Sequence, residues 1–281
     1  MKLRYMGTAA CERIPAMFCN CEVCRRALEK GGKNMMSRSQ MLIDDTLLVD
    51  FSGETYWHFL QLGRTLWDID HVLITHSHCD HLSLEDFCCR TSGQARGVRT
   101  EKMRLYTSAG VLERMRAAMD ARDDKYNPQI PERWEFVVIE TFKPFRAGDY
   151  TVTPLPASHA GEEEAFIFLI EKDGKALFYG NDTGYFNEAV DDYLVAHNKH
   201  VHFLSLDCAK GDTQLTYTTH MSMAEGRRIA DRFLARGIID ESTQLYYTHF
   251  SHGCGMIHDE LEQAAKKYGF RVTHDGLETE F

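Results

Sequence analysis

Long apolar runs, an excess of positive charge and a hydrophobic leader are all missing from this sequence. No stretch approaches the roughly 18 apolar residues that a membrane-spanning helix needs, so we expect no membrane segment. Residues 1–15 start with basic side chains but lack the apolar core of a signal peptide, which makes the cytoplasm the expected location. The sequence has 32 Lys and Arg residues and 42 Asp and Glu residues, so its net charge is −10. This balance argues against a protein that binds nucleic acid through its phosphates.

Linkers, low-complexity tracts and internal repeats are also missing, and we therefore expect residues 1–281 to form a single domain. Predicted strands are paired by turns in "MLIDDTLLVDF" at 41–51 and in "EAFIFLIEKDGKALFYG" at 164–180. Other strands alternate with helices, such as "SMAEGRRIADRFLARG" at 222–237, and "FRVTHDGLETEF" at 270–281 predicts a closing hairpin. This order favours an α/β fold in which one sheet packs on another and helices lie outside.

The nine cysteines are odd in number and unevenly spaced, which argues against a disulfide framework. Three of them, Cys19, Cys21 and Cys24, follow the spacing C-x-C-x-x-C. Three thiolates within six residues can surround a soft cation such as zinc, which then takes a fourth donor. His252, at the end of "THFSH" (248–252), is the candidate for that fourth ligand. The alternative interpretation is a run of small buried residues that happen to be cysteine.

Three histidines and an aspartate crowd into "THSHCDH" (75–81), directly after the apolar run "HVLI". Alternate side chains of an extended backbone share a face, so His76 and His78 are expected to point the same way. Asp80 and His81 follow where the chain leaves the predicted sheet. Two imidazoles with a carboxylate and a third imidazole beside them would begin two adjacent metal sites. The alternative is a histidine-rich surface loop.

Two such sites need further ligands, and sites on sheet proteins gather where strands end. His159, Asp182 and His249 each come shortly after a different predicted apolar strand. The Asp182 carboxylate is of the type that can bridge two cations. Taken singly, each of the three is more typical of a structural or exposed position, but all share the context of the first cluster.

These seven residues, in this order and each behind a strand, resemble the metallo-β-lactamase superfamily. The resemblance implies an αββα sandwich, with two mixed sheets face to face and helices on both outer faces. It also implies two divalent metals, which imidazole and carboxylate ligands allow to be zinc, manganese or iron. By this resemblance the first metal would be held by His76, His78 and His159, the second by Asp80, His81 and His249, and both by the bridging Asp182.

Four segments resemble one branch of this superfamily, the phosphoribosyl 1,2-cyclic phosphate phosphodiesterases. The segments are "GTAACERIPAMFCNCEVCRRA" (7–27), "LDC" (206–208), "THFSH" (248–252) and "FRVTHDGLETEF" (270–281). The branch implies a structural zinc on Cys19, Cys21, Cys24 and His252, and a catalytic histidine that matches His220 in "YTTHMSM". It further implies hydrolysis of a small cyclic or linear phosphodiester by a hydroxide that bridges the two metals, with Asp80, Asp182 and His220 in the catalytic set.

The sequence departs from this pattern in two places. The segment at about 84–133 is longer than the corresponding segment of the family pattern, and we interpret it as an insertion. The other feature added to the single domain is the zinc-binding loop at about 11–25. Glu162, Glu163 and Glu164 follow His159, which is unusual beside a site for an anion unless they face solvent. Both departures bear on the substrate more than on the chemistry.

Three other functions remain open at the level of sequence. The pyrroloquinoline-quinone biosynthesis protein also resembles the cysteine pattern and would imply iron-linked oxygen chemistry. A ribonuclease of the superfamily should carry a basic surface or an RNA-binding segment, and the net charge of −10 argues against it. A metal-sensing protein without catalysis should lack one or more of the ligands, whereas all seven are present. A homodimer is compatible with the sequence.

Overall fold

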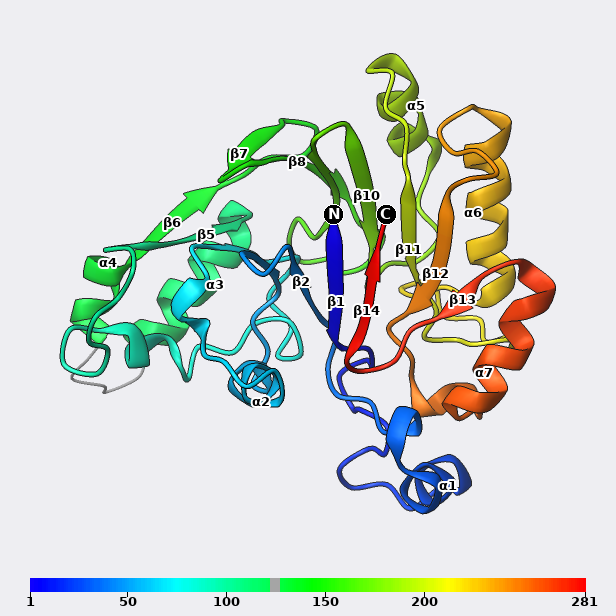
Figure 1. Cartoon of the computed structure of the whole chain (residues 1–281), viewed down its shortest axis with the longest axis horizontal. Coiled ribbons are helices and arrows are strands. Elements are labelled where there is room, and N and C mark those ends of the chain that lie inside the picture. Colours follow the sequence, from blue (N-terminus) through cyan, green and yellow to red (C-terminus); the bar gives the residue numbers. More distant parts are fainter. Residues whose placement is uncertain (122–126) are drawn as a thin grey trace.

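Two sheets lie face to face, with helices on both outer faces (Figure 1). The computed structural model describes residues 1–121 and 127–281. Within these residues each sheet has seven strands, in the orders β14-β1-β2-β3-β4-β5-β6 and β13-β12-β11-β10-β9-β8-β7. The predicted αββα sandwich of two mixed sheets is therefore confirmed.

The strands of each sheet are antiparallel over one part and parallel over the other. The first sheet contains β1 (Lys2–Gly7), β2 (Gln40–Ile43), β3 (Leu47–Val49), β4 (His71–Leu73), β5 (Met103–Thr107), β6 (Trp134–Val138) and β14 (Leu277–Glu280). The second contains β7 (Phe145–Ala147), β8 (Tyr150–Pro156), β9 (Phe166–Lys172), β10 (Lys175–Gly180), β11 (Phe203–Asp207), β12 (Gln244–Thr248) and β13 (Arg271–Val272).

Helices α2, α3 and α4 lie on the side of the first sheet and α5, α6 and α7 on the side of the second (Figure 1). The helices are α1 (Glu22–Lys30), α2 (Thr55–Gln61), α3 (Ala109–Asp120), α4 (Ile130–Arg133), α5 (Glu188–Ala196), α6 (Met223–Ala235) and α7 (His258–Ala265). The side chain of Ser108 accepts a hydrogen bond from Val111 N, so it caps α3 as its sequence position predicts. Among the described residues no helix combines the length and the apolar character needed to cross a membrane.

Strand side chains alternate between two apolar layers, which explains why the strands read as nearly continuous apolar runs. In β2, Met41 and Ile43 belong to the core between the sheets, whereas Leu42 packs on the outer side. That outer layer includes Phe59 of α2 and Val111 of α3. The second sheet is covered in the same way by the apolar faces of α5, α6 and α7. Burial on both faces holds the strand ends, and the loops that leave them, in place.

The predicted hairpin at 270–281 is wrong. Its first part, β13, pairs parallel with β12 in the second sheet, and its last part, β14, pairs antiparallel with β1 in the first. Between them Thr273 N donates to Tyr247 O and Gly276 N donates to Tyr5 O, so the chain crosses from one sheet to the other. The spacing of the two strands within 270–281 is compatible with a hairpin as well as with this crossover. Their pairing with β12 and β1 rules the hairpin out.

The segment predicted as an insertion contains regular elements of the first layer. Within 84–133, β5 pairs in parallel with β4 and β6, and α3 packs on the outer face of the sheet. Residues 122–126 of this segment lie outside the described residues.

Candidate metal centre

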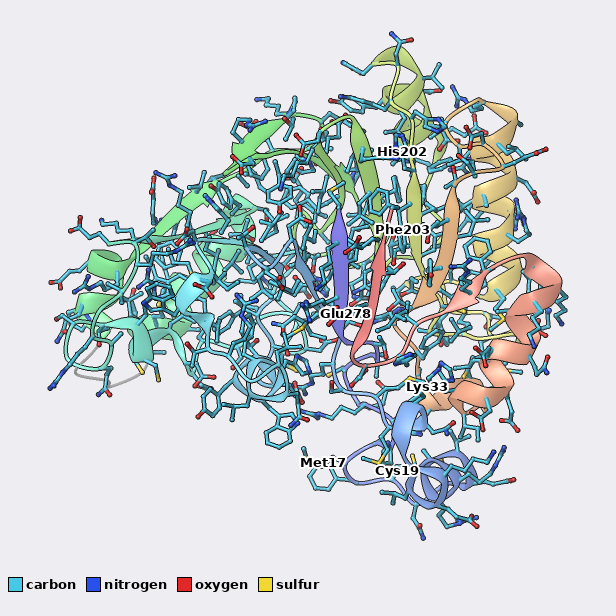
Figure 2. The ribbon with its side chains drawn as sticks, viewed as in Figure 1. Met17, Cys19, Lys33, His202, Phe203 and Glu278 are labelled. Carbon is cyan, nitrogen blue, oxygen red and sulfur yellow. The ribbon has the colours of Figure 1, made fainter. Side chains whose placement is uncertain are left out.

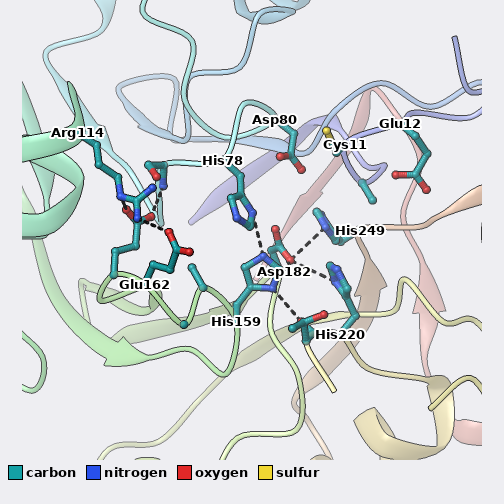
Figure 3. Close-up of a pocket in the computed structure, with 16 residues that line it drawn as sticks. Cys11, Glu12, His78, Asp80, Arg114, His159, Glu162, Asp182, His220 and His249 are labelled. Carbon is teal, nitrogen blue, oxygen red and sulfur yellow. Dashed lines mark hydrogen bonds and ion pairs between the residues drawn. The ribbon is translucent and has the colours of Figure 1, made fainter. Parts of the chain in front are cut away.

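All seven predicted ligands gather in one cluster, although they come from four separate parts of the chain. Five of them, His78, Asp80, His159, Asp182 and His249, also line a pocket (Figure 3). The seven ligands lie in the loops that follow β4, β8, β10 and β12, so each is carried by the end of a buried strand. One of these loops follows a strand of the first sheet and three follow strands of the second, so both sheets contribute to the site. Rigid strands on both sides fix the positions from which these side chains reach the pocket.

The seven candidate ligands form two groups of four side chains that share the carboxylate of Asp182. A third group that contains Asp182 adds Asp207 and His220 to His249. Within each group the candidate ligand atoms all lie within 4.8 Å of one another. The first group is His76, His78, His159 and Asp182, and the second is Asp80, His81, Asp182 and His249. Asp182 Oδ2 lies 3.3 Å from His76 Nε2 and 2.9 Å from His81 Nε2. Its Oδ1 lies 3.1 Å from His159 Nδ1 and 3.5 Å from His249 Nε2.

Several polar atoms at the centre of the pocket are buried without a hydrogen bond of normal geometry. They are Nε2 of His76, His81 and His249, and Oδ1 of Asp182. A buried polar atom without a partner costs about 1–3 kcal/mol, so four in one pocket call for an explanation. Imidazole nitrogens and a carboxylate oxygen are donors that divalent transition metals accept. The cluster therefore fits a binuclear metal site.

The opposite nitrogens of three imidazoles are held by hydrogen bonds that determine their tautomers. His81 Nδ1 donates to Asp50 Oδ2 at 2.7 Å. His249 Nδ1 lies 2.9 Å from Ser39 Oγ, which itself donates to Ala9 O and must therefore accept from the ring. With Nδ1 protonated, the lone pair of Nε2 faces the pocket, as metal binding requires.

His76 is oriented in the same manner through Thr75. The Thr75 hydroxyl donates to Asp50 Oδ1 at 2.9 Å, so at 3.0 Å it accepts from His76 Nδ1. Asp50 also accepts from the Thr75 backbone N at 2.9 Å. This single buried carboxylate thus fixes two ligand-bearing positions and belongs to the site, although the sequence analysis did not identify it. A signal was present, because Asp50 follows the apolar strand β3 just as Asp182 follows β10.

Three of these residues have backbone in the left-handed region, which side chains other than glycine rarely adopt. The φ angles are +68° at Asp50, +48° at Asp182 and +62° at His249. Each residue directly follows or nearly follows a strand end, and the sharp turn brings its side chain back toward the pocket. Such backbone persists where surrounding contacts over-determine it, and it is concentrated at functional sites.

His220 lies beside the cluster, as the resemblance implied. Its Nδ1 is 2.9 Å from Asp207 Oδ2 and 3.2 Å from Asp182 Oδ1, and its ring stacks 5.4 Å from that of His249. Burial lowers the pKa of His220, but the Asp207 carboxylate outweighs burial and raises this pKa to about 9. Asp207 is the last residue of β11. Like Asp50, it is a carboxylate of the site whose role the sequence did not predict.

The pocket opens into a cavity of about 490 Å³ whose far wall carries charged residues (Figure 3). Arg114 of α3 pairs there with Glu162 at 2.8 Å and with Glu163 at 3.2 Å. Glu162 faces solvent, whereas the side chain of Glu163 is 2% exposed and accepts from Ser77 N at 2.6 Å. Glu163 therefore anchors the loop between His76 and His78.

Residues 47–250 match the family described as "Beta-lactamase superfamily domain". The chain belongs to this superfamily. No curated protein matches the sequence significantly.

Three solved structures illustrate the shared fold across the superfamily. A diphosphatase of the PhnP family is 21% identical, with 100% of this chain and 97% of that chain covered at a TM-score of 0.74. Zinc-bound PqqB from Methylobacterium extorquens is 19% identical, with 100% of both chains covered and a TM-score of 0.74. The short form of human tRNase Z is 16% identical, with 100% and 99% covered and a TM-score of 0.63. At these identities the likeness concerns the fold. Superfamily membership and the buried His/Asp cluster together indicate a metal-dependent hydrolase.

Outside this pocket, the cysteine motif and His252 form a second cluster. Donor atoms of Cys19, Cys21, Cys24 and His252 lie within 4.8 Å of one another, and Figure 2 shows Cys19 beside α1. His252 Nδ1 is 3.5 Å from Cys21 Sγ and 3.6 Å from Cys24 Sγ. The hydrogen bond from His252 lowers the pKa of Cys21 to about 6, which favours the thiolate. Three thiols and an imidazole fit a structural zinc.

The structure modifies the expected loop at about 11–25 in one respect, because it ends in a helix. Cys21 is the N-cap of α1 and Cys24 lies in its first turn. His252, in contrast, opens a short 3₁₀ helix three residues after His249. The cysteine cluster thus joins the N-terminal segment to the strand end that carries a residue of the metal centre.

We expect Gly184→Ala to disturb the metal centre indirectly, by displacing the loop that contacts His159. A Cβ atom at this position would lie 1.7 Å from Thr218 O and 3.1 Å from Ser158 O. The loop at 218–220 would have to move, and with it Thr219 O, which lies 2.9 Å from His159 Nδ1. We expect hydrolytic activity to fall by about 10²-fold, because misplacement by about 1 Å at a site has that effect.

Gly161→Ala is the matched control for this substitution. Gly161 lines the same cavity, yet an added Cβ there would meet nothing within 4 Å. Metal content and activity are measured for both variants. Normal activity in the Gly184 variant would contradict the role assigned to this close backbone approach.

Proposed function

We propose that the chain is a phosphoric diester hydrolase that acts on a small cyclic or linear phosphodiester, with phosphoribosyl cyclic phosphates as the first candidates. The observation that carries this proposal is the juxtaposition of a complete seven-residue His/Asp cluster and the His220–Asp207 pair in one cavity. The diphosphatase among the similar structures, whose name indicates a phosphate substrate, adds support.

Two divalent ions held by the seven side chains would supply Lewis acidity toward a phosphoryl oxygen and a nucleophile at neutral pH. The chain's own residues prepare the pocket for that role. Asp50, Ser39 and Thr75 hold three imidazoles in the tautomer with Nε2 free. Burial would raise the pKa of Asp80, but the neighbouring His81 keeps this pKa well below its usual range, so the carboxylate is ionised.

His220 is suited to assist the departing oxygen. An alkoxide is a poor leaving group, and a positioned acid that protonates it in the transition state contributes substantially to the rate. With Nδ1 directed at Asp207 and a pKa of about 9, the ring carries a second proton at neutral pH. That proton sits on the remaining ring nitrogen, from which it can be donated to the substrate.

The cavity favours a small substrate over a nucleic acid. Its volume of about 490 Å³ lies within the range of about 300–1,000 Å³ typical of small-molecule sites. Its lining includes Glu12 and Glu162, and Arg114, the one arginine among the lining residues that the structure describes, is already paired with two glutamates. Such a lining would repel a long polyanion, which argues against the ribonuclease alternative.

The experiment that tests this function combines metal analysis with a substrate panel. The purified protein is loaded with zinc or manganese and assayed without oxygen on cyclic and linear phosphodiesters, including bis(p-nitrophenyl) phosphate. We expect diester cleavage that depends on the metal. A protein that holds two metals per pocket, cleaves no diester and consumes oxygen when loaded with iron would instead support the PqqB-like alternative.

We expect His220→Ala to reduce turnover by about 10²–10⁴-fold, the usual contribution of a general acid. Metal content should stay unchanged, because the seven residues outside His220 supply both proposed sites and His220 Nδ1 is engaged by Asp207, although His220 also lies close enough to Asp182 and His249 to share a cation with them. His197→Ala, on an exposed histidine at the end of α5, is the control. Turnover equal to that of the unmodified protein would remove this role from His220, and loss of a metal would make it a ligand instead.

A further inference from the structure

Two further cysteines, Cys11 and Cys79, face each other beside the metal centre, and the mechanism above uses neither. Their Sγ atoms are 3.5 Å apart, although 68 positions separate them in the sequence. Cys11 lies in the loop after β1 and lines the cavity, where Figure 3 shows it next to Asp80. Cys79 stands between His78 and Asp80, and its side chain is exposed. Small molecules in solution can therefore reach this pair.

Arg38 holds the two cysteine loops together. Its guanidinium donates to Cys11 O at 2.9 Å and to Cys79 O at 3.3 Å. The same group lies 3.8 Å from Cys11 Sγ and 3.9 Å from Cys79 Sγ. A positive charge beside both sulfurs opposes a cation between them, so the nearby Asp80 does not turn this pair into a third metal site. Two thiols held at 3.5 Å by a shared arginine are suited instead to redox chemistry.

We propose that Cys11 and Cys79 are a modification site that forms a reversible disulfide by exchange with a small-molecule disulfide such as oxidised glutathione. The sulfur of Cys79, the more exposed thiol, attacks the glutathione disulfide, whose S–S bond breaks and releases one glutathione thiol. The sulfur of Cys11 then attacks the mixed disulfide and releases the second. The two protein thiols lose two hydrogens and two electrons, and these reduce one glutathione disulfide to two thiols.

The geometry makes this bond accessible with little movement. The sulfurs must approach from 3.5 Å to about 2.05 Å. Rotations of the two side chains, with small shifts of their loops, can provide this change. Because Cys79 is flanked by two predicted ligands, the bond would pull on His78 and Asp80. We therefore expect the oxidised form to hydrolyse its substrate about 10²-fold more slowly, a consequence that rests on the proposed function.

The test uses the full-length, metal-loaded protein with oxidised glutathione as the probe. Peptide mapping under non-reducing conditions should yield a cross-linked pair that contains Cys11 and Cys79, lighter by two hydrogens than the reduced peptides. In Cys11→Ser, Cys79 should retain a stable glutathione adduct, and in Cys79→Ser no cross-link should form. The control Cys89→Ser changes another exposed cysteine and should leave the cross-link intact.

Two results would overturn the proposal: a stable glutathione adduct on Cys79 in the unmodified protein without the cross-link, or a cross-link that disappears in Cys89→Ser. The peptide map needs no enzymatic activity, so it separates this proposal from the proposed function. In an active protein, a full cross-link with unchanged turnover would overturn the expected effect on the metal centre, and recovery of turnover with dithiothreitol would support it.

Discussion

Asp182→Ala is expected to remove at least one metal from the centre and to lower hydrolysis on the order of 10³-fold, at the upper end for loss of a single electrostatic contact. The carboxylate lies within 3.5 Å of five imidazoles and belongs to both of the groups that the seven candidate ligands form. Without it, both groups lose a member and the positive charge of the cations is less well balanced. Elemental analysis of the purified variant measures the metal content, and a chromogenic diester reports activity.

The backbone at Asp182 calls for a second variant. Its φ angle of +48° is strained for alanine, whereas asparagine tolerates this region. Asp182→Asn therefore removes the charge and retains the turn, so that loss of metal in both variants indicates a lost ligand. Asp192→Ala, on an exposed residue of α5, is the surface control. Two metals and full activity in both Asp182 variants would contradict the bridging role.

Cys24→Ser is expected to remove the zinc of the cysteine cluster and to lower the melting temperature by about 5 °C. Structural zinc sites contribute several kcal/mol to folding, and a loss of about 3 kcal/mol corresponds to this shift in a protein of this size. Cys24 is buried, and its partners tie α1 to the segment after β12. Loosening that contact should also weaken activity, because His249 lies only three residues from His252.

Elemental analysis and thermal unfolding, measured on the same samples, check this prediction. One metal should disappear while the two of the catalytic pocket stay. Cys89→Ser, which replaces a cysteine outside the cluster, controls for the loss of a thiol. An unchanged metal content and melting temperature in the Cys24 variant would mean that the cluster is a group of packed thiols, the alternative raised from the sequence.

The sequence carried more information about the ligands than about the residues that orient them. Each of the seven candidate ligands is a His or Asp that follows a predicted apolar strand, which made it a candidate, and the resemblance to the superfamily then assigned it to a metal site. Ser39 and Thr75 act on the site only through hydrogen bonds to Nδ1 of His249 and His76. Their residue types do not distinguish them from other hydroxyl side chains near strand ends. Asp50 lies between these cases, since its position fits the ligand pattern while its role is to orient two histidines.

The wrong hairpin at the C-terminal end shows where local patterns stop being informative. The alternation of β13 and β14 predicts two strands, and two strands are present. Their partners lie more than 20 residues away in one case and more than 270 in the other, and no property of residues 270–281 specifies them. Distant pairing depends on the finished core between the sheets, which local propensity does not describe.

The pairing of β14 with β1 has a consequence for biosynthesis. β1 is translated more than 270 residues before β14, so one of its two edges receives its partner only when residues 277–280 have been made. Throughout translation that edge carries unpaired backbone groups, which are a template for association with other nascent chains. The first layer therefore becomes complete only after every strand of the second has been synthesised.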